Sequence, residues 1–384
     1  MDLDKKIILQ VIPRMELGGA ESGTLEISKF MVRKGWKVIV VSAGGALVEK
    51  LNSGKVIHIK LNIDSKNPLI IFLNIFRLVS IIKKFNVKIV HARSRAPAWS
   101  AYYACKFFKR IKFVTTVHGA YKNQNFIKKF YNSIMLKSDK IIAISKYIKN
   151  YLLKEYTVKK NNLKKINVIP RGVDSYKYNN KNIDSSRLFK QLKEWEISDD
   201  NLVIIFPARI APFKGHKTLI KAISLLKKDI KKKFICLFVG SANKNSSFEE
   251  EITSIINDYK IDENIKFVGT CHDMPAAYKL SDIVVSPADK PEGFGRIIIE
   301  AQAMERLILA SAHGGSLELI KNNVNGFLFE PLNALDLANK LKLLIKLSKN
   351  DKKKIINFAK KEVGEKYDIN KMCSLNFQLY NSLV

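Results

Sequence analysis

The chain has 384 residues, is 47% hydrophobic and carries a net charge of +32, so it can bury the cores of two or three domains. Its cysteines, Cys105, Cys236, Cys271 and Cys373, are far apart and form no Cys-x-x-Cys pair, which excludes a disulfide framework and a structural zinc site. No N-terminal stretch combines a basic start, an apolar run and a small-residue cleavage site, so we expect no secretory signal and a cytoplasmic protein.

The first half alternates short apolar runs with helical patterns, which is typical of a parallel sheet covered on both faces. Helices are expected at Ala20 to Lys34 and Pro68 to Phe85. The expected strands are Lys6 to Ile12, Lys37 to Ser42, Val56 to Lys60, Val87 to Ala92, Lys112 to Val117, Lys140 to Ile144 and Lys164 to Ile169. We therefore predict a doubly wound α/β domain over residues 1–169.

The segment Pro68 to Ile82 is apolar enough to suggest a membrane span. It is too short, and Asn74, Arg77 and Ser80 recur at every third position, which predicts one polar face. We expect an amphipathic helix that covers the sheet.

The second half repeats the same alternation after a polar stretch that runs to Ser186 and is typical of a linker. The expected strands are Asn201 to Ala208, Phe234 to Val239, Ile265 to Val268, Ile283 to Ser286, Leu307 to Ala310 and Gly326 to Phe329. These predict a second doubly wound domain over residues 170–366. An amphipathic helix within residues 367–384 is expected to pack back on the first domain.

Two signals of a nucleotide-sugar site lie in the segment Pro291 to Glu300: a Gly-x-Gly turn that leads into a helical pattern, and two carboxylates, Glu292 and Glu300. A helix that begins near Arg296 would direct its unpaired backbone N–H groups at a diphosphate. The glycines let that diphosphate approach the backbone. Because carboxylates do not pair favourably with phosphates, we expect the glutamates to contact sugar and ribose hydroxyl groups.

Another loop follows the strand Asn201 to Ala208 and carries Arg209 and Lys214 ahead of a helix. An arginine and a lysine at this spacing can neutralise a leaving diphosphate. Two solvated charges are the alternative. The glycine-rich anion loop in the same half favours the cationic clamp.

Two loops of the first half follow strands in the same way. Gly18 and Gly19 open a helix, which is an anion site in principle, although a tight packing turn explains the pair equally well. His118 follows the strand that ends at Val117. A lone histidine is usually structural, and its place at the end of a strand favours a role in a site.

A third loop places Arg93, Arg95 and Trp99 after the strand that ends near Val90. Arginine is scarce, with eleven among the 67 basic residues, and its planar fork suits anionic groups. We expect these residues to receive an anionic acceptor. The alternative is a solvated turn in which Trp99 packs.

Together these motifs resemble retaining glycosyltransferases of the GT-B fold, specifically the GT4-type group, also called glycosyl transferases group 1. The residues that carry the resemblance are Gly18 to Glu21, Ile169 to Asp174, Arg209 with Lys214-Gly215, Glu292 to Gly295 with Glu300, Gly314-Gly315 and Asn325-Gly326. The match spans nearly the whole chain. It implies two Rossmann-like domains that face an interdomain cleft, a nucleotide-diphosphate sugar as donor, and no metal or other cofactor.

By this resemblance, Glu292 contacts hydroxyl groups of the donor sugar, Glu300 contacts the ribose, and His118 lies by the sugar from the first domain. Arg209 and Lys214 neutralise the diphosphate.

Backbone amides around Gly18-Gly19 and in the segment Gly293, Phe294, Gly295 and Arg296 complete the implied donor site. The family pattern implies front-face attack with retention, in which the departing phosphate oxygen helps to take the acceptor proton.

Two positions depart from the family pattern. Arg171 stands where the family often has Asn, and Leu317 stands where it often has Pro. The segment His91 to Trp99 resembles a subset that acts in lipopolysaccharide core or surface-glycan assembly. That subset implies a hexose-type sugar, with mannose as one option, and a lipid-linked or lipopolysaccharide core acceptor.

Three further segments are candidates for metal binding or membrane contact. Asp2-Leu3-Asp4 is the one Asp-x-Asp of the sequence, and at the start of the chain it is a poor metal site. The segments Lys106 to Arg110 and Phe126 to Tyr131 mix aromatic and basic residues, which suits peripheral contact with an anionic membrane, at the inner face of the cytoplasmic membrane. Ordinary lysine-rich helices with buried aromatic residues explain them nearly as well.

Two other classes of function stay open. A nucleotide-sugar epimerase or hydrolase of the same fold would act without an acceptor. A nucleic-acid-binding protein would explain the charge, but we find no recognition motif and expect no nucleic-acid partner. The positive charge also has a background explanation, because lysine is the default surface residue of this chain.

Overall fold

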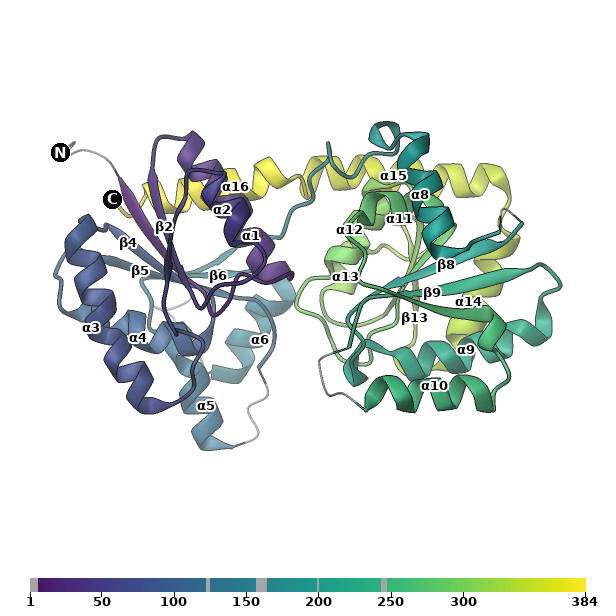
Figure 1. The fold of residues 1–384 in the computed structure, drawn as a ribbon, viewed down its shortest axis with the longest axis horizontal. Helices are drawn as coiled ribbons and strands as arrows, with labels where there is room; N and C mark the ends of the chain where they lie inside the picture. Colours follow the sequence, from purple (N-terminus) through teal and green to yellow (C-terminus); the bar gives the residue numbers. More distant parts are fainter. Residues whose placement is uncertain (1–5, 122–124, 157–163, 199, 243–246) are drawn as a thin grey trace. The chain divides into compact units, whose positions relative to one another are not determined.

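The computed structural model describes residues 6–121, 125–156, 164–198, 200–242 and 247–384. The chain forms two compact units (Figure 1): one consists of Met1–Arg171 with Ile369–Val384, and the other of Gly172–Asp368. Both boundaries lie two residues beyond the predicted ones, which were 169 and 366.

The first unit is built on a parallel seven-stranded sheet with the order β3-β2-β1-β4-β5-β6-β7. Its strands are β1 (Ile7–Val11), β2 (Lys37–Ser42), β3 (Ile57–Lys60), β4 (Ile89–Ala92), β5 (Lys112–Val117), β6 (Lys140–Ala143) and β7 (Ile166–Val168). Its helices are α1 (Gly19–Arg33), α2 (Val48–Asn52), α3 (Pro68–Phe85), α4 (Arg95–Lys106), α5 (Phe126–Ser133), α6 (Lys146–Tyr156) and α16 (Ile369–Asn381), with the short η1 (Ile134–Leu136).

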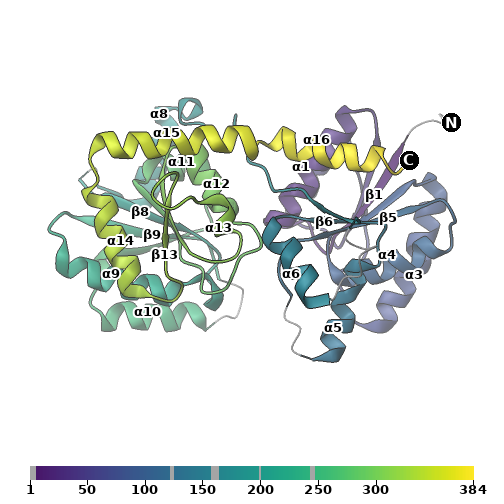
Figure 2. The same ribbon diagram turned by 180° about the vertical axis from the view of Figure 1, so that it is seen from behind.

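The helices of this unit cover both faces of the sheet. Helix α16 returns to the first unit and lies against α1 (Figure 2), while α3 and α4 pack together on the opposite face. Tyr380 anchors α16 in the core of this unit. It is fully buried, and its hydroxyl oxygen lies 2.7 Å from His91 Nδ1, within hydrogen-bond distance. The last helix is therefore part of the first core although nearly 200 residues of the other unit precede it.

Helix α3 does not face the way its sequence pattern predicts. Asn74 is 1% exposed, and its Nδ2 donates to the backbone oxygen of Asn62 at 2.8 Å. Phe72 and Phe76, in contrast, are exposed. The predicted polar face is therefore divided: Asn74 satisfies a loop carbonyl inside, whereas Arg77 and Ser80 are exposed beside apolar side chains that also point to solvent. In the part of the chain described, no helix is long and apolar enough to cross a membrane.

The second unit contains a parallel six-stranded sheet with the order β10-β9-β8-β11-β12-β13. Its strands are β8 (Leu202–Pro207), β9 (Phe234–Val239), β10 (Ile265–Gly269), β11 (Ile283–Ser286), β12 (Leu307–Ser311) and β13 (Phe327–Phe329). Its helices are α8 (Ser185–Trp195), α9 (His216–Asp229), α10 (Phe248–Asp258), α11 (Met274–Leu280), α12 (Arg296–Ala303), α13 (Ser316–Leu319), α14 (Ala334–Lys346) and α15 (Lys349–Lys366), with η2 (Asn180–Asn182), η3 (Pro212–Lys214) and η4 (Asp262–Asn264). Helices α9, α10 and α14 lie on one face, and α8, α11, α12 and α15 lie on the other.

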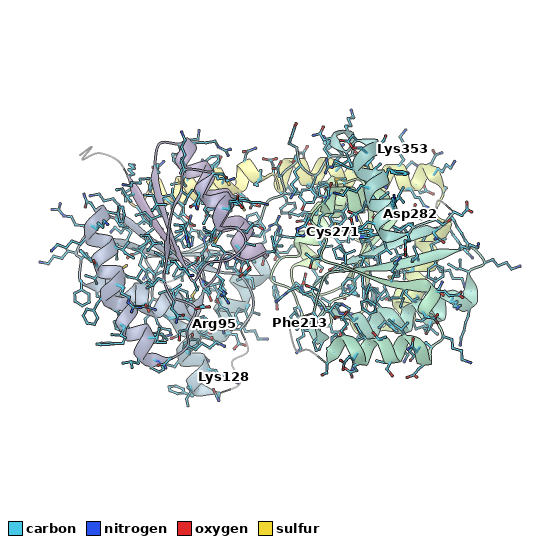
Figure 3. All side chains as sticks on the ribbon, in the orientation of Figure 1. Arg95, Lys128, Phe213, Cys271, Asp282 and Lys353 are labelled. Atoms are coloured by element: carbon cyan, nitrogen blue, oxygen red, sulfur yellow. The ribbon has the colours of Figure 1, made fainter. Side chains whose placement is uncertain are left out.

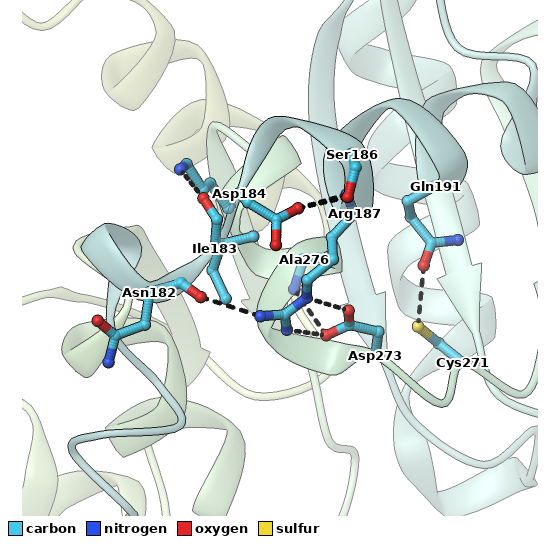
Figure 4. A network of polar contacts seen from close by, with 10 residues as sticks. Asn182, Ile183, Asp184, Ser186, Arg187, Gln191, Cys271, Asp273 and Ala276 are labelled. Carbon is cyan, nitrogen blue, oxygen red and sulfur yellow. Dashed lines mark hydrogen bonds and ion pairs between the residues drawn. The ribbon is translucent and has the colours of Figure 1, made fainter.

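The predicted linker before Ser186 is instead an ordered part of the second unit. Asp184 caps helix α8 by accepting from the Arg187 backbone N–H at 2.9 Å. The Arg187 guanidinium donates two hydrogen bonds to the Asp273 carboxylate, at 2.7 and 2.6 Å, and a third to the Asn182 carbonyl (Figure 4). The polar composition that predicts a linker therefore supplies a helix cap and an ion pair.

Each sheet has one place where the strand order reverses direction. It lies between β1 and β4 in the first unit and between β8 and β11 in the second. Open parallel sheets bind ligands at the carboxyl ends of the strands at such a point, because the two flanking loops diverge there. The predicted site residues follow these strands, except His118, which follows the next strand, β5.

Candidate functional site

In the second unit three loops meet at the carboxyl ends of the adjacent strands β8, β11 and β12. They comprise residues 208–215, 287–295 and 312–315. The Asp289 N–H donates to the Phe213 carbonyl at 3.1 Å, and the Gly315 N–H donates to the Glu292 carbonyl at 2.9 Å. The Arg209 to Lys214 loop and the Glu292 turn, which are far apart in sequence, therefore form one structure.

Two glycines make this close meeting possible. Gly215 has a φ of 90°, and a Cβ there would lie 1.7 Å from the Pro287 carbonyl oxygen. A Cβ on Gly315 would lie 2.2 Å from the Phe294 carbonyl oxygen. A side chain at either position would push the loops apart.

The meeting of the loops places two predicted donor residues in direct contact. Lys214 Nζ donates to Glu292 Oε1 at 2.5 Å, and the two side chains are 20% and 22% exposed. Arg209 lies on the same loop as Lys214 and is exposed. The site thus offers two cations and one carboxylate, and the carboxylate is fixed by one of the cations.

Two helices begin at these loops with glycine as N-cap. Gly215 precedes α9 with a φ of 90°, and Gly295 precedes α12 with a φ of 103°. In the described structure neither N-cap residue supplies a side-chain acceptor for the first N–H groups. These helix starts therefore add positive potential to the cations beside them.

Glu300 lies one turn inside α12, as the sequence predicts. It is 9% exposed, it pairs with Arg296 Nη2 at 3.1 Å, and it accepts from the Tyr278 hydroxyl at 3.0 Å. Burial, together with the Glu300 charge, raises the pKa of Tyr278 well above its usual range, so this hydroxyl remains a donor. Glu300 is therefore held in one orientation, with 11% of its side chain accessible.

In the first unit Arg171 supports the start of α1 behind Gly18. Its side chain is 5% exposed, and Nη2 donates to the Gly19 carbonyl at 2.7 Å and lies 3.6 Å from Glu26. A Cβ on Gly23 would lie 1.9 Å from the guanidinium. The departure from the family pattern at position 171 is thus accommodated by a glycine, and it puts a buried positive charge beside the Gly18-Gly19 helix start.

His118 follows β5, as predicted. Its Nε2 is buried and has no hydrogen-bond partner among the residues that the structure describes. Burial, followed by the charges of Arg171 and Arg93, lowers the pKa of His118 well below its usual range. The imidazole is therefore neutral at pH 7 and retains a ring nitrogen that a ligand can use.

Comparisons with known proteins agree with this geometry. The family described as Glycosyl transferases group 1 matches residues 189–362, and the one described as Glycosyltransferase Family 4 matches residues 17–176. The solved structure of a glycosyltransferase from Rickettsia africae is 38% identical, covers 99% of each chain and has a TM-score of 0.89. The chain belongs to the GT4-type glycosyltransferases, and its fold is GT-B.

More distant members add detail about the family. Anabaena HepE, solved in complex with UDP and glucose, has a TM-score of 0.85 over 98% of this chain and all of that one, and at 20% identity it shows the fold alone. The N,N'-diacetylbacillosaminyl-diphospho-undecaprenol alpha-1,3-N-acetylgalactosaminyltransferase of Campylobacter jejuni is 25% identical over 86% of both chains. Alignments with two uncharacterized glycosyltransferases of Methanocaldococcus jannaschii, 28% and 24% identical, span 56% and 60% of those proteins.

The side chains of two residues from the predicted sites of this glycosyltransferase point inward. Phe294 is 4% exposed and packs edge-on against the Tyr367 ring, with centroids 5.8 Å apart. Arg93 is 3% exposed, and its Nε and Nη2 donate to Gln10 Oε1 at 2.8 and 2.6 Å. The prediction that the Arg93 side chain contacts the acceptor is corrected, because the side chain joins the loop after β4 to β1. The Phe294 side chain anchors the donor turn, and the contact predicted for its backbone amide stays a prediction.

Arg95 and Trp99 remain half-buried. The Arg95 guanidinium lies 4.5 Å from the centre of the Tyr121 ring and donates to Asn132 Oδ1 at 2.9 Å. Trp99 Nε1 donates to the Tyr131 carbonyl at 3.2 Å. Their contact with an acceptor stays a prediction.

Asp289 is a site residue that the sequence reasoning missed. Its Oδ1 accepts from Thr218 Oγ1 at 2.8 Å, which ties the β11 loop to α9. Burial raises the pKa of Asp289. Its position three residues after β11 was the available signal.

No group of three His, Cys, Asp or Glu side chains within the described residues is placed to hold a metal ion, and the four cysteines are free. Asp2-Leu3-Asp4 lies outside the described residues. Transfer without a metal stays a prediction for this family member.

The buried histidines predict how stability depends on pH. Burial lowers the pKa of His216 to about 4, and the pKa values of His91 and His118 are also below the unfolded value of 6.5. Because the unfolded chain then binds protons that the folded chain does not, the contribution of these histidines to stability should become constant about one unit above pH 6.5. Below it, each such histidine should remove up to about 1.4 kcal/mol per pH unit.

Urea unfolding at pH values from about 7.5 to about 5 measures this slope. His216→Leu should make the acid slope shallower because it removes one of the titrating groups. Leucine suits the position, since the side chain lies among the rings of Phe206, Phe238 and Phe248. His272→Gln changes an exposed histidine and should leave the slope as it is. An unchanged slope in His216→Leu would contradict the prediction.

Proposed function

We propose that this protein transfers a hexose-type sugar from a nucleoside diphosphate to a glycan acceptor, with retention at the anomeric carbon. The observation that carries the proposal is the Lys214–Glu292 pair at the β8/β11 reversal, between two helix starts capped by glycine. Cations and helix starts suit a diphosphate, and a fixed carboxylate suits sugar hydroxyl groups.

The charges set the mechanism. Breaking the anomeric C–O bond leaves negative charge on the diphosphate and positive charge on the sugar ring. Arg209, Lys214 and the starts of α9 and α12 stabilise the leaving group, so the protein needs no divalent metal for this step. Glu292 orients the sugar. The departing phosphate oxygen helps to take the acceptor proton as the acceptor attacks from the same face.

Two further residues complete the donor roles. Glu300, held by Arg296 and Tyr278, accepts from the ribose hydroxyl groups. His118 is the donor-sugar contact of the first unit, a role supported by its neutral ring and its buried Nε2.

For the acceptor we propose a lipid-linked glycan, a class that includes lipopolysaccharide core precursors, reached from the cytoplasmic face of the membrane. The name of the Campylobacter jejuni relative specifies a sugar linked to diphospho-undecaprenol, which supports this class. Arg95 and Trp99 are the residues we assign to it. Mannose stays one option for the sugar.

A thermal-shift panel of UDP-, GDP- and ADP-linked hexoses tests the donor. A donor at about 100 times its Kd should stabilise the fold by about 2.7 kcal/mol, because it binds the folded chain alone. The UDP and glucose found in Anabaena HepE make UDP-glucose the first compound to test.

Arg209→Ala should weaken donor binding at least about tenfold through the lost phosphate contact. Lys353→Ala removes an exposed charge on α15 (Figure 3) and should not weaken it. A shift that inorganic phosphate reproduces in full, or no shift with any donor, would contradict the assignment.

A further inference from the structure

The outer face of α3 is apolar. Leu69, Phe72, Leu73 and Phe76 recur at helical spacing and are 65%, 53%, 45% and 51% exposed. The opposite face of α3 buries Leu78 and Ile82 and packs against α4, so the outer residues are not part of the core. A row of four exposed large apolar side chains on one helix marks an interaction surface.

The row continues across neighbouring elements. Phe72 contacts Phe76 with ring centroids 5.3 Å apart, and Phe76 contacts Phe107, at the end of α4, with centroids 6.3 Å apart. Earlier in α4, Trp99 stacks on Tyr103 with centroids 6.1 Å apart.

Trp99 also contacts Phe130 of α5, with ring centroids 5.4 Å apart. Phe126 and Ile127, at the start of α5, are 83% and 75% exposed. We call Leu69, Phe72, Leu73, Phe76, Tyr103, Phe107, Phe126, Ile127 and Phe130 the α3–α5 surface.

The sequence segment that carries the α3–α5 surface has charges of a single sign. From Ser65 to Ser138 the sequence contains 15 Lys or Arg and no Asp or Glu. An even distribution of the chain's 35 acidic residues would place about seven of them there. A lysine-rich background composition does not account for this absence of acidic residues. The positive charge of residues 65–138 is therefore a local feature of this segment.

We propose that the α3–α5 surface docks on an anionic lipid bilayer, with the aromatic and aliphatic side chains in the interface and the basic residues at the headgroups. Interfacial helices combine an apolar face with lysine and arginine in this way. Lys128, on α5 (Figure 3), is an exposed basic residue of this segment. Lys109 and Arg110, which follow Phe107 in the sequence, are exposed as well. The proposal does not depend on the transferase assignment.

Charge favours a bilayer over a second copy of the chain. In a symmetric dimer the same patch would face itself, and its basic residues would meet like charges with no carboxylate from residues 65–138 to pair them. Anionic headgroups supply the missing sign on a flat surface, and long lysine side chains can reach them while their methylene groups remain in the apolar layer.

Flotation of the full chain with vesicles tests the proposal. The protein should bind vesicles with about two parts phosphatidylcholine to one part phosphatidylglycerol more strongly than pure phosphatidylcholine, and less strongly at high salt. The double variant Phe72→Asp with Phe76→Asp should lower the partition coefficient at least about tenfold. The matched control, Leu335→Asp with Leu343→Asp, changes exposed leucines on α14 and should leave binding unchanged.

A second pair of variants isolates the charge. Lys109→Glu with Arg110→Glu should weaken binding to the anionic vesicles, whereas Lys353→Glu with Lys354→Glu makes the same change of net charge on α15 and should not.

Equal binding to both vesicle types, no binding, or equal loss in the control variants would overturn the proposal. A dimer in solution that Phe72→Asp with Phe76→Asp dissociates would also overturn it and assign the surface to a second copy. None of these assays measures turnover, so their failure leaves the proposed transfer intact.

Discussion

Glu292→Ala is expected to lower the kcat/KM of sugar transfer by roughly a thousandfold while the nucleotide still binds. Loss of a contact that orients the reacting sugar acts on the transition state, and single contacts of this kind are worth roughly 10²- to 10³-fold in rate. The diphosphate keeps Arg209, both helix starts and Lys214. Because Lys214 also loses the carboxylate that it contacts, nucleotide affinity should stay level or increase.

The measurement is steady-state transfer beside calorimetric titration with the nucleoside diphosphate. Glu292→Gln should recover part of the rate if orientation through hydrogen bonds is the main role. Glu250→Ala, an exposed glutamate on α10, is the control and should behave as the parent protein. Near-normal turnover in Glu292→Ala would remove Glu292 from the site.

Gly315→Ala should damage the site and the fold together. The added Cβ would lie 2.2 Å from the Phe294 carbonyl oxygen, a backbone atom that cannot move alone. Overpacking of this kind costs about 1–3 kcal/mol of unfolding free energy. Because the Gly315 N–H also holds the Glu292 carbonyl, the turn should shift, and a misplacement of about 1 Å can cost roughly 100-fold in rate.

Gly364→Ala provides the matched control, since nothing lies within 4 Å of a Cβ there and the residue is inside α15. Alanine should stabilise that helix by about 0.5–1 kcal/mol and leave transfer unchanged. Urea unfolding and initial rates measure both quantities. Gly315→Ala with parental stability and rate would show that the loops have room to separate.

The sheet and the donor loops could be predicted from the sequence because each depends on local signals. Buried parallel strands read as mostly apolar or β-branched runs, so β5, β9 and β11 were predicted with the bounds that the structure gives them. The start of α12 near Arg296 followed from the Gly-x-Gly turn before it.

What the sequence could not provide is the direction of individual polar side chains. Asn74 faces inward because the backbone carbonyl of a loop needs a donor. Arg93 faces inward because Gln10, on a neighbouring strand, accepts two hydrogen bonds from its guanidinium. The contact of Lys214 with Glu292 likewise depends on the neighbouring positions of β8 and β11 in the sheet. Residues 175–186 were predicted as a linker since caps and ion pairs have the same composition as a flexible segment.

The central claim is transfer from a nucleoside diphosphate sugar to an acceptor. Its most direct test is the release of nucleoside diphosphate from the donor that the thermal-shift panel identifies, followed with and without lipid-linked glycan acceptors. The account predicts release that requires the acceptor, is matched by a glycosylated product with retained anomeric configuration, and is lost in Glu292→Ala. Release of free sugar without an acceptor, or an epimerised donor, would contradict it.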